Sequence, residues 1–518
     1  MAGAALYAGR QALTYAEDPA GDKSGPSILP TPTAGPPPAR AAPVPADAPT
    51  ELPWAQRGGT IDDASWLDRT AVHGIVRVTQ PQDVADALAY ARARDLMVST
   101  AGVRHSMGGH AFYHDAVVLD MTAFNRVTLD AANRLITVQS GATWHDIQEQ
   151  IHPRFAVIAM QSTDIFTVGG SLSVNAHGMD HRAGAIADTV RWLRVMLPDG
   201  TVRLVSRAAD PELFRLVVGG YGLFGVILEA QLEVTDNALY HSERRVVDYR
   251  AFPDLFERDI LPDPKLGLFY GHLSTAPGSL LREMILYTYR DAGPPPPDLP
   301  PLREVSQVKL RRLVINLSKQ GGLFRSAKWF LERHVEPRLE SCTVTRAQGL
   351  ASAEGCFVSR NEPMHDSVPY LRNNLRGETD ILQEYFVPRA RFVPFVDAAR
   401  DILASQRANL LNASVRAVHR EDVALNYAPE DMFALVLYVN QRTDDAGNRA
   451  MRTLTQSLID ATIGAGGRFF LPYQLHYTPA QLERSYPEIG AFFRAKRRYD
   501  PDHLLTNTWY ETYAPHWL

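Results

Sequence analysis

The sequence predicts an α+β protein built from two folded bodies. Its 518 residues, 45% of them hydrophobic, are enough to fill two sizeable cores. Three glycine clusters between residues 99 and 225 each lie beside an apolar run typical of a strand. After about Thr235 the sequence changes in character: it has longer predicted loops, a Pro-rich insert at 293–301 and basic amphipathic stretches. This difference in sequence character indicates two folded bodies. From about residue 456 the sequence again resembles the first part, with short loops between its predicted elements.

Composition and charge exclude several classes of protein. The net charge is −5 and the basic residues are scattered, so we expect no nucleic-acid partner. No run approaches the roughly 20 apolar residues of a membrane span. Residues 1–13 are too weakly apolar for a signal peptide, and Cys342 and Cys356, which could pair, make no disulfide framework. These observations favour a cytoplasmic protein, with peripheral membrane contact left open.

The first part of the chain is predicted to be disordered. Residues 25–53 are rich in Pro and Ala, and such a segment buries too little apolar surface to order itself. We therefore assign residues 1–55 to a Pro/Ala-rich disordered tail and linker.

The first body, residues 56–235, combines short strands with helices. A strand precedes a helix at 81–94, whose apolar residues recur at helical spacing. A hairpin is predicted at 126–140 and a helix at 143–151, with Thr143 as its cap. The strand–Gly-x-Gly-x-x-Gly–helix pattern of a Rossmann domain is absent from the first glycine loop.

The three glycine-rich loops of this body indicate a ligand site. The first spans 99–112 between two strands, the second spans 167–181, and the third, 218–225, runs into an apolar strand at 226–234. Glycines let a backbone turn sharply and bring bare N–H groups close to a ligand, which suits anionic phosphates. Turns alone explain isolated glycines, but three clusters beside strands predict loops that converge on one long ligand.

The second body, residues 236–455, is predicted to be an α+β cap with antiparallel strands. Strands are expected at 380–388, 410–418 and 432–440. The stretch 309–333 alternates apolar and basic residues. That pattern fits either a solvated helix face or a patch that faces a membrane or a lipid substrate.

Five motifs occur in the order that one known family shows. They are Gly102-Val-Arg-His-Ser-Met-Gly108, Thr167-Val-Gly-Gly-Ser171, Ala176-His-Gly178, Gly219-Gly-Tyr-Gly-Leu-Phe-Gly225 and Tyr499-Asp-Pro501. In this order they resemble the vanillyl-alcohol oxidase / p-cresol methylhydroxylase (PCMH-type) family of FAD enzymes, in part its decaprenylphosphoryl-ribose oxidases and alditol oxidases. The resemblance covers about 72–518. It implies a two-part FAD-binding domain, 56–235 completed by 456–518, with an inserted α+β substrate (cap) domain on an antiparallel sheet at 236–455.

The resemblance also implies that FAD is the cofactor and that the glycine loops bind it. The first two loops are expected to wrap the pyrophosphate, Val226 and Ile227 to lie near adenine, and His177 and Asn507 to flank the flavin. The full set of expected FAD-binding residues is Ala101, Gly102, Val103, Arg104, His105, Ser106, Met107, Gly108, Thr167, Gly169, Gly170, Ser171, Asn175, His177, Gly178, Val226, Ile227 and Asn507.

His105 matches the position at which these oxidases join the flavin 8-methyl group to an imidazole. A neutral imidazole nitrogen is nucleophilic, so one covalent histidyl–FAD bond at His105 is our hypothesis. The alternative is a non-covalent FAD to which His105 only donates a hydrogen bond. Arg104 replaces the glycine that such relatives have beside this histidine.

An alcohol oxidised by hydride transfer to flavin N5 must give its hydroxyl proton to a base. We expect Tyr473 or His476 to be that base. In the prenylphosphoryl-sugar enzymes of this family an active-site lysine lies at about Tyr473, so this chain lacks that charge. Asp164 lies near the place where cytokinin dehydrogenases have an aspartate base, but the spacing to the second loop is shorter, so Asp164 ranks lower.

Three further side chains are expected to position the substrate. Gln383 and Tyr385 share one face of the predicted strand, opposite to Glu384, and match polar positions of the family's substrate pocket. Arg416, on another cap strand, is expected to supply the charge of the missing lysine. No metal ligand pattern is expected.

We interpret the chain as an FAD-dependent oxidase or dehydrogenase that oxidises a C–OH group of a sugar, a polyol or a related alcohol. The flavin is reoxidised by oxygen or by another acceptor. One alternative is the redox half of an epimerisation on a polyprenyl-phosphoryl sugar, in which 309–333 contacts a membrane. An alternative of another class is a flavin-binding scaffold without turnover.

Overall fold

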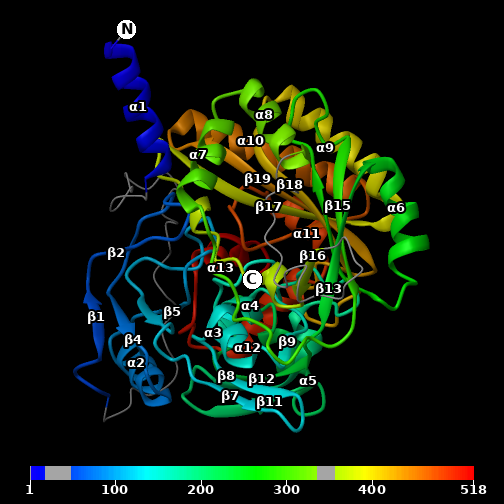
Figure 1. Cartoon of the computed structure of the whole chain (residues 1–518). Helices are drawn as coiled ribbons and strands as arrows, with labels where there is room; N and C mark the ends of the chain where they lie inside the picture. The colour runs from blue at the N-terminus through cyan, green and yellow to red at the C-terminus, as the bar shows by residue number, and fades with distance from the viewer. Residues whose placement is uncertain (1, 18–47, 335–355) are drawn as a thin grey trace.

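The computed structural model describes residues 2–17, 48–334 and 356–518. Figure 1 shows a first body drawn in blue and cyan and a second body drawn mainly in green, yellow and orange, packed against each other. Both bodies combine helices with antiparallel sheets, so the fold is α+β. The cap strands share one hydrophobic core with the second sheet of the first body, which includes Ile136 and Leu437.

The first body begins with a four-stranded sheet in the order β1, β4, β6 and β5. The central pairs are parallel, and α2 carries the chain from β4 to β5 and packs its buried face on Val76 and Val98. A separate two-stranded sheet joins β2 to β3. The bounds are β1 (Trp54–Arg57), β2 (Thr60–Ile61), β3 (Thr70–Ala71), β4 (Gly74–Arg77), α2 (Pro81–Ala93), β5 (Val98–Ala101) and β6 (Val117–Asp120).

The second sheet of this body is antiparallel, in the order β11, β10, β12, β8 and β7, with β9 paired to β12. The expected hairpin at 126–140 is confirmed as β7 and β8, and Thr143 caps α3 by accepting the N–H of Asp146. The bounds are β7 (Val127–Asp130), β8 (Leu135–Gln139), α3 (Trp144–Ile151), β9 (Phe155–Val157), α4 (Val168–Ser173), β10 (Val190–Met196), β11 (Val202–Val205), α5 (Pro211–Val217) and β12 (Val226–Asp236).

The cap is built on an eight-stranded antiparallel sheet in the order β16, β13, β15, β14, β18, β19, β17 and β20. Helices α9 and α10 pack on one face of this sheet. The bounds of its strands are β13 (Leu239–Asp248), β14 (Leu266–Leu273), β15 (Glu283–Asp291), β16 (Cys356–Ser359), β17 (Glu378–Pro388), β18 (Asn409–Val418), β19 (Met432–Arg442) and β20 (Arg468–Phe469). The bounds of its helices are α6 (Phe252–Leu255), α7 (Val308–Ser318), α8 (Gly322–His334), α9 (Phe392–Ser405) and α10 (Asp445–Gly464).

The C-terminal segment returns to the first body. Leu505 forms a parallel bridge with Val98 of β5, and Leu504 and Leu505 belong to the core of the four-stranded sheet. The three last helices, drawn in orange to red in Figure 1, are α11 (Pro479–Ser485), α12 (Ile489–Tyr499) and α13 (Thr508–Tyr513). The first body is therefore made of two stretches of chain with the cap strands between them.

The N-terminal residues differ from the expectation of a disordered tail. Residues Ala2–Ala16 form the helix α1, which packs against α7 of the cap. The last turn of α1 is held through its backbone, because the side-chain amide of Asn316 donates to the carbonyl of Tyr15 at 2.8 Å. A tertiary contact of this kind supplies the order that a short isolated helix lacks.

Two expectations concern parts of the chain outside the described residues. Most of the predicted tail, residues 18–47, lies outside them, as does Cys342, so the pairing of the two cysteines is not described. Within the described ranges, the structure contains no helix with the length and apolar character needed to cross a bilayer.

Candidate active site

A large cavity lies between the glycine loops of the first body and the cap sheet. Its volume is about 1890 Å³, and its walls include residues of all three glycine clusters together with β14, β15, β17 and β18 of the cap. The loops that the sequence predicted to converge on one ligand therefore do meet. A cavity of this size accommodates both a dinucleotide and a substrate.

Most of the expected FAD-binding residues line this cavity. Those on its walls are Ala101, Gly102, Val103, Arg104, His105, Ser106, Met107, Thr167, Gly169, Gly170, His177, Val226, Ile227 and Asn507. The remaining four, Gly108, Ser171, Asn175 and Gly178, do not line it. Ser171 instead hydrogen-bonds Gln161, and Asn175 donates to the buried carboxylate of Glu421, so both act behind the wall.

The first glycine loop is held by Asp63, a cavity-lining residue that the sequence analysis missed. One carboxylate oxygen of Asp63 accepts the N–H groups of Gly108 and Gly109, each at 2.7 Å, and the other accepts the N–H of Ser65. Arg104 has a φ of +60°, a left-handed conformation that suits the glycine of the family motif. Asp63 is 4% exposed, and the segment around it contains no recognisable sequence motif. Its role is therefore apparent only from its contacts with the loop in the structure.

The first and second glycine loops form a cradle without room for side chains. A Cβ on Gly102 would lie 2.1 Å from Oγ1 of Thr167, and a Cβ on Gly169 would lie 2.8 Å from Cβ of Ser140. Ser140 also lines the cavity, and its buried Oγ has no hydrogen-bond partner among the described residues. Close backbone approach and an unpaired buried hydroxyl both fit a polar ligand such as the FAD pyrophosphate.

His105 lies on the cavity wall with its ring edge-on to Phe166, at 5.5 Å between centroids. Burial lowers the pKa of His105 to about 4, against the opposing charge of Asp63. The imidazole is therefore neutral at neutral pH. A neutral ring retains the nucleophilic lone pair that a covalent bond to flavin requires.

A buried hydrogen bond connects the second glycine loop to the cap sheet. Nε2 of His177 lies 2.7 Å from Oε1 of Glu384, and both side chains line the cavity. The rings of Phe386, Tyr427 and Phe470 surround His177 at 5.6–6.4 Å between centroids. An apolar surrounding strengthens such a pair and places one carboxylate at the cavity surface.

The expectation that Gln383 and Tyr385 face the substrate is wrong. Gln383 donates to Thr455 of α10 at 2.8 Å, and the hydroxyl of Tyr385 donates to Gln383 at 2.7 Å. Neither side chain lines the cavity, whereas Leu382 and Glu384 do. The alternation of the strand was predicted correctly, but α9 and α10 cover the face that carries the two polar residues.

Of the two expected bases, only Tyr473 lines the cavity. Burial, with the charge of Glu384, raises the pKa of Tyr473 well above its usual value, so its hydroxyl remains a donor and is no base at neutral pH. His476 lies behind the wall, 2% exposed, and burial lowers its pKa to about 3. Asp164 also lies outside the cavity wall, where its carboxylate contacts His145, His365 and Ser367.

Arg416 lies on the wall as expected. Its guanidinium donates to Oγ of Ser162 at 2.9 Å and lies 5.1 Å from the ring centre of Tyr270. The guanidinium keeps its charge in proteins even where burial lowers the pKa, so Arg416 brings a fixed positive charge to the cavity. Ser162 belongs to the first body, so this contact also joins the two bodies.

The cap contributes a second polar wall that the sequence analysis missed. Lys328 of α8 forms an ion pair with Glu332, and Glu332 lies 3.3 Å from Nε2 of His272. Burial opposes ionisation of Glu332, but the charges of Lys328 and His272 outweigh it and bring the pKa of Glu332 to about 2. Tyr270 and Tyr287 stack beside this group at 4.5 Å between centroids. The wall presents charge, hydrogen-bonding groups and aromatic faces together.

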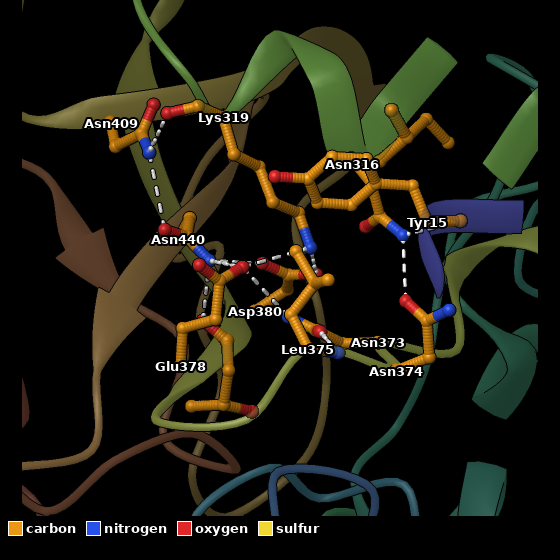
Figure 2. A network of polar contacts seen from close by, with 12 residues as sticks. Tyr15, Asn316, Lys319, Asn373, Asn374, Leu375, Glu378, Asp380, Asn409 and Asn440 are labelled. Atoms are coloured by element: carbon orange, nitrogen blue, oxygen red, sulfur yellow. Dashed lines mark hydrogen bonds and ion pairs between the residues drawn. The ribbon is translucent and has the colours of Figure 1, made fainter. Parts of the chain in front are cut away.

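A polar network lies beside the cavity wall, around Lys319 and Asp380 (Figure 2). Nζ of Lys319 lies 2.7 Å from Asp380 and 3.4 Å from Glu378, and its side chain is 1% exposed. Asn440 donates to both carboxylates, at 2.8 and 3.0 Å. Asp380 lines the cavity, so this network fixes the start of β17 against α7.

Residues 72–206 match a family model described as an FAD binding domain. A stretch of 142 residues is 34% identical to decaprenylphosphoryl-beta-D-ribose oxidase of Mycolicibacterium smegmatis, over 27% of this chain and 31% of that protein. Cytokinin dehydrogenase 4 of Arabidopsis thaliana is 25% identical over 451 residues, 80% of each chain. This chain belongs to the PCMH-type FAD-binding oxidoreductase family.

The expected family and its cofactor, FAD, are thereby confirmed. The family model matches within the first body. An oxidoreductase of the fasciation locus in Rhodococcoides fascians is 36% identical over 161 residues, which is 30% of this chain and 35% of that protein. The chain thus spans about a third of the length of several relatives it matches.

Proposed function

We propose that this protein is an FAD-dependent oxidoreductase that oxidises a C–OH group of a sugar, a polyol or a related alcohol. The observation that carries this proposal is the buried pair of His177, from the second glycine loop, and Glu384, from the cap sheet, on the cavity wall. A carboxylate in this place can take the hydroxyl proton of an alcohol.

In this proposal Glu384 is the base, and His177 is the residue that orients it. His177 donates Nε2–H to one oxygen of Glu384, which holds the carboxylate at the cavity surface. Bound FAD supplies the acceptor for the hydride that leaves the alcohol carbon. The hydroxyl proton of the alcohol passes to Glu384. Tyr473 donates a hydrogen bond to the substrate, and Arg416 presents its positive charge to negatively charged groups in the cavity.

The substrate side of the cavity suits a molecule with several hydroxyl groups. Lys328, Glu332 and His272 offer charged donors and acceptors, and Tyr270 and Tyr287 offer flat apolar faces. Sugars combine these two features, since their hydroxyls bind polar groups and their C–H faces pack on aromatic rings.

The experiment is an anaerobic titration of the purified yellow protein with a panel of sugars, polyols and simple alcohols. Bleaching of the flavin band by one class, followed by recovery with oxygen or an added acceptor, supports the proposal. A flavin that dithionite bleaches but that no member of the panel reduces would support the scaffold alternative instead.

We also propose that FAD is attached covalently through His105. The neutral state of this imidazole supports the proposal. Denaturation and washing of the wild-type protein should leave the precipitate yellow, whereas His105→Ala should release all of its colour. Release of the colour from the wild-type precipitate refutes the bond.

A second candidate is oxidation of a polyprenyl-phosphoryl sugar, as the name of the mycobacterial relative describes for that protein. Leu310 and Leu331 both line the cavity and are 54% and 41% exposed, on α7 and α8. Leu323 and Phe330 of α8 are 80% and 59% exposed. This apolar edge suits a substrate with a lipid tail, and co-sedimentation with anionic liposomes, lost in Leu323→Glu, would distinguish it from oxidation of a free sugar.

A further inference from the structure

A cluster of histidines and carboxylates lies outside the candidate active site. His145 and Glu149 stand one turn apart on α3, His365 follows β16, and Glu304 precedes α7. One potential ligand atom from each of the four lies within 4.8 Å of the other three. Three separate segments of the chain therefore bring two imidazoles and two carboxylates to one point.

The histidine nitrogens have defined roles. Nδ1 of His145 is hydrogen-bonded to a carboxylate oxygen of Asp164 at 3.0 Å, and Asp164 is 1% exposed. Nδ1 of His365 is hydrogen-bonded to Oε1 of Gln148 at 3.0 Å and lies 3.1 Å from the same oxygen of Asp164. The carboxylate oxygen of Asp164 and the amide oxygen of Gln148 only accept, so both Nδ1 atoms are protonated and donate. This fixes the tautomer and leaves the lone pair of each Nε2 on the other side of the ring, facing the two glutamates.

The Nε2 contacts are too long for hydrogen bonds but close to the spacing of metal ligands. Nε2 of His145 lies 3.5 Å from Oε1 of Glu304, and Nε2 of His365 lies 3.7 Å from the same oxygen and 4.0 Å from Glu149. Metal bonds of about 2.0–2.2 Å in a tetrahedron place ligand atoms roughly 3.3–3.6 Å apart.

His365 gives an independent indication of a missing ligand. Its side chain is 1% exposed, and its Nε2 is buried without a hydrogen-bond partner among the described residues. A buried nitrogen in this state needs an explanation, because an unsatisfied polar atom destabilises the fold. A metal ion bound to Nε2 supplies that explanation, while Asp164 orients the rings as carboxylates do behind zinc-bound histidines.

We propose that His145, Glu149, Glu304 and His365 form a zinc site. Asp164 positions His145, and Gln148 together with Asp164 positions His365. Two imidazoles favour zinc over calcium or magnesium, which prefer oxygen ligands alone. Four protein ligands make the site structural, since no position is left open for a substrate.

The site would tie α3 of the first body to two segments that line the active-site cavity. Glu304 lies two residues before Ser306 and three before Gln307, and His365 directly precedes the stretch 366–373. Ser306, Gln307 and residues 366–373 all line the cavity. Asp164 reinforces this link, because it accepts a hydrogen bond from Ser367 at 2.7 Å. Zinc would therefore hold part of the cap against the flavin-binding domain.

The test is zinc binding by the full-length flavoprotein after chelator treatment, measured by calorimetry and by metal content after gel filtration. We expect one zinc ion per chain. His145→Ala and Glu304→Gln should each weaken binding by at least about tenfold, and Asp164→Asn by about 10- to 100-fold. Cobalt in place of zinc should give the intense visible bands of tetrahedral coordination beyond the flavin absorption.

A matched control is His114→Ala, because His114 has a similar exposure to His145, 32% against 30%, and also lies near one carboxylate. This variant should bind zinc as the wild type does. Retained flavin colour shows that the variants fold, and Glu304→Gln changes a side chain that is 68% exposed. Absence of stoichiometric zinc in the wild type, or unchanged affinity in His145→Ala and Glu304→Gln, overturns the proposal.

Discussion

The substitution Glu384→Gln tests the assignment of the base most directly. Glutamine keeps an oxygen that can accept the Nε2–H of His177 at the observed 2.7 Å, so the fold and the bound flavin should persist. The amide cannot accept the alcohol proton. A positioned base contributes about 10²- to 10⁴-fold to such a step, which corresponds to about 3–5 kcal/mol of barrier.

The assay is the rate of anaerobic flavin bleaching in a stopped-flow instrument, with whichever alcohol reduces the wild type. Glu384→Gln should bleach at least about 100-fold more slowly. The control is Gln383→Met, because Gln383 lies on the opposite face of β17 and contacts α10. This substitution should change the bleaching rate by only a few-fold. A loss of less than tenfold in Glu384→Gln, or a large loss in Gln383→Met, refutes the reasoning.

Three other substitutions test the cradle, the polar network and the buried histidines. Gly102→Ala places a Cβ 2.1 Å from Thr167 and should abolish flavin retention on gel filtration, whereas Gly464→Ala, with open space around it, should stay yellow. Lys319→Met leaves buried carboxylates unpaired and should lower the free energy of unfolding in urea by about 3–5 kcal/mol; a loss below about 1 kcal/mol contradicts this. Burial lowers the pKa of His181 from 6.5 to about 4. Between these two pH values the unfolded chain therefore binds a proton at His181 that the folded chain does not bind. The free energy of unfolding should fall by up to about 3 kcal/mol as the pH drops from 6.5 to 4. His181→Leu should flatten that part of the stability profile, and an unchanged pH dependence would show that His181 is not its source.

The local elements were the most predictable part of the chain. The helix expected at 143–151 and the hairpin at 126–140 appear because capping and turn signals act between near neighbours. The glycine loops were equally clear, since no other residue tolerates such close backbone approach as Gly102 makes to Thr167. The convergence of these loops followed from their number and their places beside strands.

The face of β17 was not predictable from its sequence. Nearly every residue of this strand is buried, so alternation shows that Gln383 and Glu384 point to opposite sides but not which side is the cavity. That choice depends on α10, which lies some seventy residues later and satisfies Gln383 through Thr455. The order of α1 depends in the same way on Asn316 of a distant helix.

The zinc-site residues illustrate a limit of motif reasoning. His145 and Glu149 have helical spacing, but such pairs are common on solvated helices and carry no signal alone. His365 and Glu304 come from unrelated segments of the cap. Only the fold brings their side chains to the same carboxylate and to one another.

The pairing of β5 with the C-terminal segment has a consequence for biosynthesis. The hydroxyl of Ser99 donates to the carbonyl of Thr506, 407 positions further along, and Asn507 completes the cavity wall. While a ribosome is still making the cap, the flavin-binding half already translated has an open edge and a cavity lacking one side. Loading of the yellow cofactor is therefore expected only once the segment around Thr506 has been made and has folded, and nascent chains stalled before residue 500 should emerge colourless.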